Sequence, residues 1–367
     1  MRAHELRTVL LVQAVEETDT TGELLPLAER DAVTREILRD AGAAGAAGEF
    51  FGGDRLSDLG ERLLVRRTRE LQARLRLRAP IIDRLLAESV GAGRRDGLLV
   101  LALLVGFVLA ALDGRSYIDI LGPALVGILA WNLGVYALRL ANLAGPRSLS
   151  GAGITRLYGR WLSGRAAALL RRSRAFNAPL AAALPRFTKE WGVLAQALVM
   201  LRAIRLFHVC AALVALGMIA GVAVRGFVLR DAAGWSSSLF GPGIVRGFVW
   251  IVYAPAAALA RIALPASSVE VESLHVAGAS GGGASSAWVV LIASTLALYI
   301  IVPRVFAAAV ATLRMWHSAR TMAVPALVLP YARRTLSAAD AAVSAQENQA
   351  TTNIESGSGA NKDASDA

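Results

Sequence analysis

Long runs of apolar residues most constrain what this chain can fold into. Four such runs, 97–112, 118–138, 206–229 and 287–313, contain very few charged side chains. About 20 apolar residues in a helix cross a hydrocarbon core of about 30 Å, and runs of this kind are typical of transmembrane helices. The sequence therefore predicts an all-α integral membrane protein with four transmembrane helices.

The first two predicted spans form a hairpin within residues 96–141. The run 97–112 gives a helix of only about 24 Å at 1.5 Å per residue, so flanking residues or local thinning of the bilayer must complete the crossing. Asp113-Gly114-Arg115 then provides a tight turn into the second span, 118–138.

Small residues four positions apart occur in two of the predicted spans. Ala130 and Gly134 lie in the second span, and Gly217 and Gly221 lie in the third. Small side chains at this spacing let two helix backbones approach closely. Both pairs are therefore candidate positions for close helix packing.

The segments between the spans differ in charge. Residues 1–95 are balanced, with 16 Lys and Arg against 16 Asp and Glu, whereas residues 142–205 carry 11 Lys and Arg against Glu190 alone. The loop 230–286 has no net charge. Because cytoplasmic loops carry excess Lys and Arg, this pattern predicts an external loop and both termini in the cytoplasm of a bacterial inner membrane.

The segments outside the spans are predicted to be largely helical. Within 1–95, amphipathic stretches begin near Leu6, Leu27 and Leu56, and could form a small bundle or dock on another surface. In the external loop, 243–264 is apolar but contains arginines and Pro255, so it is interpreted as an interfacial or re-entrant helix. The cytoplasmic tail 314–367 is expected to be disordered from about residue 337.

Two groups of charged residues are candidate sites. Asp113, Asp119 and Arg225 fall at the outer ends of predicted spans and could form an external ion-pair cluster. The basic segment favours contact with anionic lipids, with docking of an acidic cytosolic partner as the alternative. Its candidate residues are Arg156, Arg160, Arg165, Arg171, Arg172 and Arg174.

Polar residues inside the spans are few. Asn132 is the only strongly polar side chain expected near the bilayer centre, and Arg304 is expected to extend from the inner boundary to the headgroups. A transport pathway would need carboxylates nearer the centre, so a small transporter or channel is kept as the alternative function.

The sequence gives no sign of catalysis. The four histidines, His4, His208, His275 and His317, do not stand at ligand spacing with other metal-binding residues, and the glycine-rich stretches lack the pattern of a phosphate loop. Cys210 is the only cysteine, so an internal disulfide is excluded. No enzyme activity, cofactor, metal or nucleic-acid partner is predicted.

Several short motifs suggest a family. They are Ala14-Val15-Glu16 with Asp19, Gly22, Leu24-Leu25, Arg30, Ala32 and Arg35, then Leu112-Asp113-Gly114-Arg115, Trp131-Asn132-Leu133 and Pro303-Arg304. Together they resemble an uncharacterised family of proteobacterial inner-membrane proteins, a domain of unknown function, over most of residues 1–335. The resemblance implies a GTPase partner, because members are often encoded beside a predicted Era-like GTPase, and it implies no catalytic residues. The predicted function is thus a non-enzymatic membrane anchor or receptor that organises a cytosolic partner.

Overall fold

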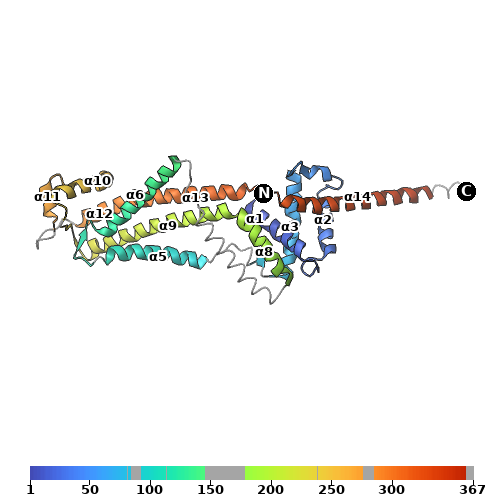
Figure 1. The fold of residues 1–367 in the computed structure, drawn as a ribbon, viewed down its shortest axis with the longest axis horizontal. Coiled ribbons are helices and arrows are strands. Elements are labelled where there is room, and N and C mark those ends of the chain that lie inside the picture. The colour runs from blue at the N-terminus through green and yellow to red at the C-terminus, as the bar shows by residue number, and fades with distance from the viewer. Residues whose placement is uncertain are drawn as a thin grey trace. The chain divides into compact units, whose positions relative to one another are not determined.

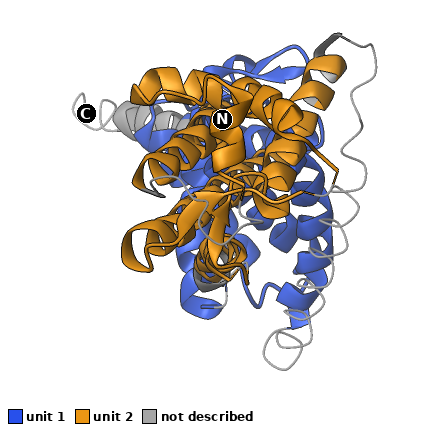
Figure 2. Ribbon diagram, turned by 90° about the vertical axis from the view of Figure 1, so that its left-hand side faces the viewer, with its two compact units in different colours: residues 1–88, 152–199, 315–367 blue, residues 89–151, 200–314 orange. Residues whose placement is uncertain are grey.

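The computed structural model describes residues 1–80, 82–83, 92–112, 114–144, 178–237, 239–275 and 285–360, which are mostly helical (Figure 1). The chain forms two compact units, each assembled from segments far apart in the sequence (Figure 2). Unit 1 comprises residues 1–88, 152–199 and 315–367, and unit 2 comprises residues 89–151 and 200–314.

Unit 1 is a helical bundle built around α1 (Ala3–Thr18). Helix α1 packs against α3 (Asp58–Arg78) and α8 (Ala178–Leu194), while α2 (Leu27–Asp40) packs against α3 and α14 (Val328–Ala360). A short turn, η1 (Ala47–Glu49), and an antiparallel hairpin of β1 (Phe51–Gly52) and β2 (Arg55–Leu56) connect α2 to α3. Every residue from Val9 to Val15 is buried, so α1 forms the centre of the core.

The three stretches predicted before residue 95 coincide with helices α1, α2 and α3, but α1 is buried over most of its length rather than on one face. The turn that separates α1 from α2 contains Gly22, whose φ of +71° lies in the left-handed region that glycine adopts readily. At the start of α3 the Ser57 hydroxyl accepts a hydrogen bond from the Gly60 amide at 3.1 Å, which caps the helix. Because these helices bury their leucines against one another, they form one bundle within unit 1.

The tail is the clearest departure from the prediction in unit 1. Disorder was expected from about residue 337, but α14 runs from Val328 to Ala360. Its residues Tyr331, Leu336 and Val343 are buried, and the Asp340 carboxylate accepts hydrogen bonds from the amides of Gly45 and Ala47 at 2.8 and 3.1 Å. A sparse apolar stripe and one buried carboxylate therefore order a segment whose composition alone looks like a linker.

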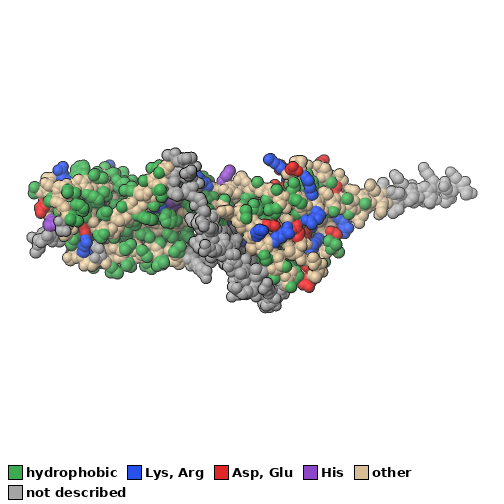
Figure 3. All heavy atoms as spheres, viewed as in Figure 1, with side chains coloured by type: hydrophobic (Ala, Val, Ile, Leu, Met, Phe, Trp, Pro, Cys, Tyr) green, Lys and Arg blue, Asp and Glu red, His purple; other side chains and the backbone are tan. Residues whose placement is uncertain are grey.

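Unit 2 contains the apolar helices. They are α5 (Ala92–Ala111), α6 (Pro123–Ala144), α9 (Gln196–Ala223), α10 (Pro242–Ala260), α12 (Ser285–Leu296) and α13 (Val302–Arg320). Two π-helical segments, η2 (Val224–Val228) and η3 (Ala297–Ile301), continue α9 and join α12 to α13, and α11 (Ser268–Ser273) is a short helix. Large hydrophobic side chains cover the visible surface of these helices, whereas charged side chains gather on unit 1 (Figure 3).

Within the part of the chain that the structure describes, three helical stretches are long and apolar enough to cross a membrane: 196–228, 242–260 and 286–320. The helices 96–111 and 123–138 are apolar but shorter. This set differs from the predicted four spans, because it includes α10 and omits α5 and α6. Helix α10 runs unbroken past Pro255, so the proline and arginines that argued against a span do not interrupt it.

The predicted second span began too early. Residues Tyr117–Asp119 form β3, which pairs in parallel with β4 (Ala232–Gly234), and α6 starts only at Pro123. Proline suits the first turn of a helix because its missing amide hydrogen would have no partner there. The third span was predicted to start too late, at residue 206, since α9 begins at Gln196.

The small-residue pair in the third span lies at a close helix contact, as predicted. A Cβ atom added to Gly217 would collide with the carbonyl oxygen of Leu103, and one on Gly221 would lie 2.7 Å from that of Phe107, both on α5. Gly106 on α5 meets the backbone of α9 in the same way. Gly134 on α6, by contrast, faces open space, so the pair in the second span does not mark such a contact.

Candidate functional site

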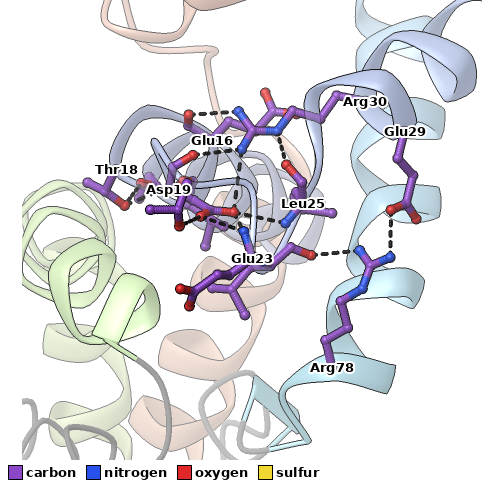
Figure 4. A network of polar contacts seen from close by, with 12 residues as sticks. Glu16, Thr18, Asp19, Glu23, Leu25, Glu29, Arg30 and Arg78 are labelled. Carbon is purple, nitrogen blue, oxygen red and sulfur yellow. Dashed lines mark hydrogen bonds and ion pairs between the residues drawn. The ribbon is translucent and has the colours of Figure 1, made fainter.

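The turn between α1 and α2 is held by a dense polar network (Figure 4). The Asp19 carboxylate accepts hydrogen bonds from the backbone amides of Glu23, Leu24 and Leu25 at 2.9–3.1 Å. The Arg30 guanidinium donates to the carbonyls of Leu25, Glu16 and Asp19 at 2.6–3.0 Å. Several residues of the opening motif therefore serve to fix this turn, and Asp19 and Arg30 are structural rather than available to a ligand.

The acid sensitivity of unit 1 is expected to depend on Asp19. Burial raises the pKa of this carboxyl, but the hydrogen bonds from Leu25, Leu24, Thr21 and Glu23 outweigh burial and hold the pKa below its ordinary value. A lowered pKa in the folded state stabilises the fold above the unfolded pKa of about 3.9, and this stability is lost as pH falls through the folded pKa.

The test is Asp19→Asn, measured as the free energy of unfolding of the full chain in detergent between pH 3 and pH 7. At neutral pH we expect a loss of about 1–3 kcal/mol, because an amide nitrogen then faces backbone donors. Below about pH 4 the variant should lose less further stability than the wild type. Asp54→Asn is the control, since that carboxylate is fully exposed. If the free energy of unfolding fell equally steeply below about pH 4 for Asp19→Asn and for wild type, the prediction would be contradicted.

A second buried network joins α1, α2, α3 and α14. The Arg67 guanidinium forms an ion pair with Glu16 at 2.8 Å and donates to the Thr34 and Tyr331 hydroxyls, each at 2.8 Å. The Tyr331 hydroxyl in turn donates to Glu16 at 2.8 Å. Burial raises the pKa of Tyr331, so this hydroxyl keeps its proton and can be donor and acceptor at once. The network is rigid because each group has a defined partner.

This network forms the floor of a cleft of about 770 Å³ in unit 1. Helices α2 and α14 supply its walls, and α1 and α8 contribute charged residues. The lining residues are Glu16, Glu17, Leu27, Arg30, Asp31, Thr34, Arg35, Arg67, Arg186, Tyr331, Arg334, Thr335, Ala338, Ala339 and Ala342. Five arginines against three carboxylates give the cleft a net positive charge.

Three arginines are placed to meet a ligand in this cleft. The side chains of Arg334 and Arg186 are 65% and 46% exposed, and both bind the Glu17 carboxylate, at 3.1 and 2.5 Å. Arg35 lines the cleft on α2 and has no hydrogen bond or ion pair within the described residues. The cationic ends are therefore at the opening, while the charges of the floor are satisfied internally.

Unit 2 holds a polar centre among its apolar helices, and here a prediction was wrong. Arg304 was expected to reach the headgroups, but its side chain is fully buried. Its Nε and Nη2 atoms donate to the Asn132 Oδ1 atom at 2.8 and 2.6 Å, and Nη1 lies 3.1 Å from His208 Nδ1. The rings of Tyr136 and Phe207 lie 5.3 and 5.2 Å from the guanidinium carbon. Residues from α6, α9 and α13 thus converge on one guanidinium.

The local backbone helps to place this arginine. Arg304 follows the π-helical segment η3, whose Tyr299 carbonyl accepts a hydrogen bond from the Tyr136 hydroxyl at 3.1 Å. A π-helical turn frees backbone groups from the regular ladder, so a side chain can bind there. A guanidinium only donates, so His208 Nδ1 must act as the acceptor. Sequence spacing could not reveal this centre, because its residues come from three helices.

The proposed external cluster is only partly described. Asp113 lies outside the described residues. Asp119 pairs with Arg115, whereas Arg225 pairs with Asp231 at 2.8 Å and also donates to the carbonyls of Arg115 and Tyr117. Asp119 and Arg225 line the same small cavity of about 40 Å³. The structure therefore brings them to one region and gives each an ion-pair partner close by in the sequence.

The basic docking residues Arg156, Arg160, Arg165, Arg171, Arg172 and Arg174 also lie outside the described residues. The described part of the basic segment includes α8, which packs on α1 and supplies Arg186 to the cleft. Among the described residues no group of three or more His, Cys, Asp or Glu side chains could hold a metal ion. The cleft in unit 1 is therefore the strongest candidate site.

No family model, curated protein or solved structure matches this chain. The resemblance to the proteobacterial inner-membrane family stays a prediction, and a function has to be argued from the geometry.

Proposed function

We propose that this chain is a non-enzymatic membrane anchor that presents the helical unit 1 to a soluble partner at the bacterial inner membrane. The observation that carries the proposal is the preformed positive cleft of about 770 Å³ on a rigid hydrogen-bonded floor. A site whose framework is already ordered loses little conformational entropy when it binds, so it suits recognition.

The apolar surface of unit 2 supports the membrane half of the proposal. Exposed leucine, valine and isoleucine side chains follow α5, α10 and α13, and three stretches are long and apolar enough to cross a bilayer. Soluble proteins rarely expose apolar surface of this extent. In the proposed topology both termini and the basic segment are cytoplasmic, as suits segments that fold into the one unit 1. Helix α10 then does not cross the bilayer but is interfacial or re-entrant, and the loop with α11 is external.

The cleft chemistry supports binding more than catalysis. Glu16 and Arg67 are paired to each other and hydrogen-bonded to Tyr331, so they are poorly placed to exchange protons with a substrate. Glu17 is held by two arginines. The partner that the family resemblance implies is a GTPase, and we propose a GTPase as the first candidate to test.

The proposal predicts that residues at the opening of the cleft contact a soluble protein in cells. A photocrosslinking amino acid in place of Leu27, which lines the cleft and is 69% exposed, should give one discrete adduct. The same group in place of Leu77, which is 85% exposed and lies outside the cleft lining, should not. Adducts are separated by gel and their soluble component is identified by mass spectrometry.

The result that would overturn the anchor proposal is equally specific. If Leu27 gives only lipid adducts or adducts with a second copy of this chain, no soluble partner occupies the cleft. A GTPase in the adduct would support the partner that the resemblance implies, whereas another soluble protein would keep the anchor and replace the partner.

Transport is the second candidate, and the polar centre at Arg304 favours it. Ionisable residues inside apolar helical bundles are expensive and often mark ion pathways. The contacts of Arg304 with Asn132 and His208 supply polar groups that the sequence pattern had not placed together.

A further inference from the structure

The two walls of the unit 1 cleft present complementary faces to a bound chain. On α2, Leu27, Asp31 and Arg35 are spaced four residues apart and so lie on one face. On α14, the lining residues are mostly small: Thr335, Ala338, Ala339 and Ala342. Small side chains on a helix let another backbone come close. At 1.5 Å per residue the lining residues span about 12 Å on α2, from Leu27 to Arg35, and about 10 Å on α14, from Thr335 to Ala342, which matches a short peptide segment.

The chain's own Glu17 shows which chemical group the opening of the cleft accepts. Arg186 on α8 and Arg334 on α14 point at the same carboxylate from two different helices, at 2.5 and 3.1 Å. Arginines that converge in this way recognise carboxylates through charge-assisted hydrogen bonds. Arg186 also donates to the Glu190 carboxylate at 3.1 Å. Both guanidinium groups are about half exposed or more, so part of each remains open to a further carboxylate.

Charge complementarity selects the sign of the ligand. Arg35, Arg186 and Arg334 surround the opening on three helices, and Arg35 has no partner within the described part of the chain. The acidic groups Glu16 and Glu17 are already bound by Arg67 and by the opening arginines. Asp31 on α2 is the remaining carboxylate of the lining, and the three arginines at the opening outnumber it. A basic segment would have to displace the ion pairs of Glu16 and Glu17 to reach these carboxylates, whereas an acidic segment can bind the exposed arginines without breaking those pairs.

We infer that the cleft between α2 and α14 binds an acidic peptide segment of the soluble partner, held by Arg35, Arg186 and Arg334. This inference rests on the proposed anchor function and names the chemistry of its partner. The small residues of α14 receive the backbone of the segment, and its carboxylates meet the arginines. Because the arginines are at the opening, association is steered by charge and weakens as salt rises.

The test uses the full chain in nanodiscs of phosphatidylcholine, which carry no net lipid charge. The probe is a fluorescein-labelled decapeptide of alternating Glu and Ala, and binding is followed by fluorescence anisotropy at low and moderate salt. We expect Arg35→Gln with Arg334→Gln to weaken binding by about tenfold or more. The matched control is Arg55→Gln with Arg62→Gln, which removes two exposed charges from unit 1 outside the cleft lining and should leave the affinity within about twofold.

Three results of the binding assay would overturn the inference, and a fourth would come from the crosslinking experiment. One is equal binding to wild type and to the Arg35→Gln, Arg334→Gln variant, and another is equal binding of a Lys-Ala decapeptide. The third is displacement of the probe by inorganic phosphate or free glutamate at the peptide's own concentration, which would make the cleft a small-anion site. If the crosslinker at Leu27 still captures the soluble partner in the Arg35→Gln, Arg334→Gln variant, the anchor function is supported but the acidic-segment inference is wrong. If the crosslinker gives no adduct even in the otherwise wild-type chain, the proposed anchor function itself is wrong.

Discussion

Replacing Gly217 with valine is expected to prevent α9 from packing against α5. A Cβ atom at this position collides with the carbonyl oxygen of Leu103, and its next neighbour, the amide nitrogen of Phe107, lies at 2.8 Å. Both obstacles are backbone atoms, which cannot move aside as a flexible side chain can. Overpacking usually costs about 1–3 kcal/mol. Here the two helices would have to separate, so we expect a loss at or above the upper end of that range.

The control for this prediction is Gly134→Val, because nothing lies within 4 Å of a Cβ atom added there. Both variants place the same side chain in an apolar helix of unit 2, so they differ mainly in what the added methyl groups meet. The measurement is the yield of monodisperse protein in detergent and its melting temperature. A Gly217→Val protein with the melting temperature of wild type would show that α5 and α9 do not pack as described.

The second large effect is expected from Arg304→Met. Methionine removes the donors that satisfy Asn132 Oδ1 and His208 Nδ1 in the polar centre of unit 2. Asn132 Oδ1 loses both bonds from Arg304, and a buried acceptor left without a partner costs about 1–3 kcal/mol, so we expect a loss of at least that size. Arg314→Met is the matched control, since Arg314 is exposed on the same helix, α13.

A double variant separates lost hydrogen bonds from lost packing. Asn132→Leu combined with Arg304→Met removes the amide together with its donor, so part of the stability should return relative to Arg304→Met alone. Strictly additive losses in melting temperature would count against the Asn132–Arg304 bond. Proton flux into proteoliposomes, measured on the same proteins, addresses the transport alternative: a flux in wild type that Arg304→Met abolishes would favour transport over the anchor.

Local patterns were enough to predict several parts of the molecule. The apolar runs marked the helices of unit 2, and the spacing of leucines located α1, α2 and α3. The pair Gly217 and Gly221 indicated a close helix contact, which the structure confirms against α5. These predictions hold because helix formation and burial of a helix face depend mainly on residues three and four positions apart.

Other features escaped the sequence because they depend on partners distant in the chain. Ile118 and Asp119 lie within the predicted second span, yet residues 117–119 pair with Ala232–Gly234 as a short parallel strand. The tail from residue 337 has the composition of a linker, yet Asp340 binds backbone amides near Gly45. In both cases long-range hydrogen bonds outweigh local propensity.

The candidate sites divide in the same way. The sequence by itself determined that the chain carries apolar membrane-type helices, a separate charged helical region and an excess of arginine, because these depend on composition and local periodicity. Only the tertiary structure decided which arginines are buried and which face a cleft: Arg67 and Arg304 are held inside, whereas Arg35 and Arg334 line an opening. The physical reason is that a guanidinium is stable in the interior only where acceptors from several helices converge on it, and that convergence is set by packing rather than by spacing along one chain.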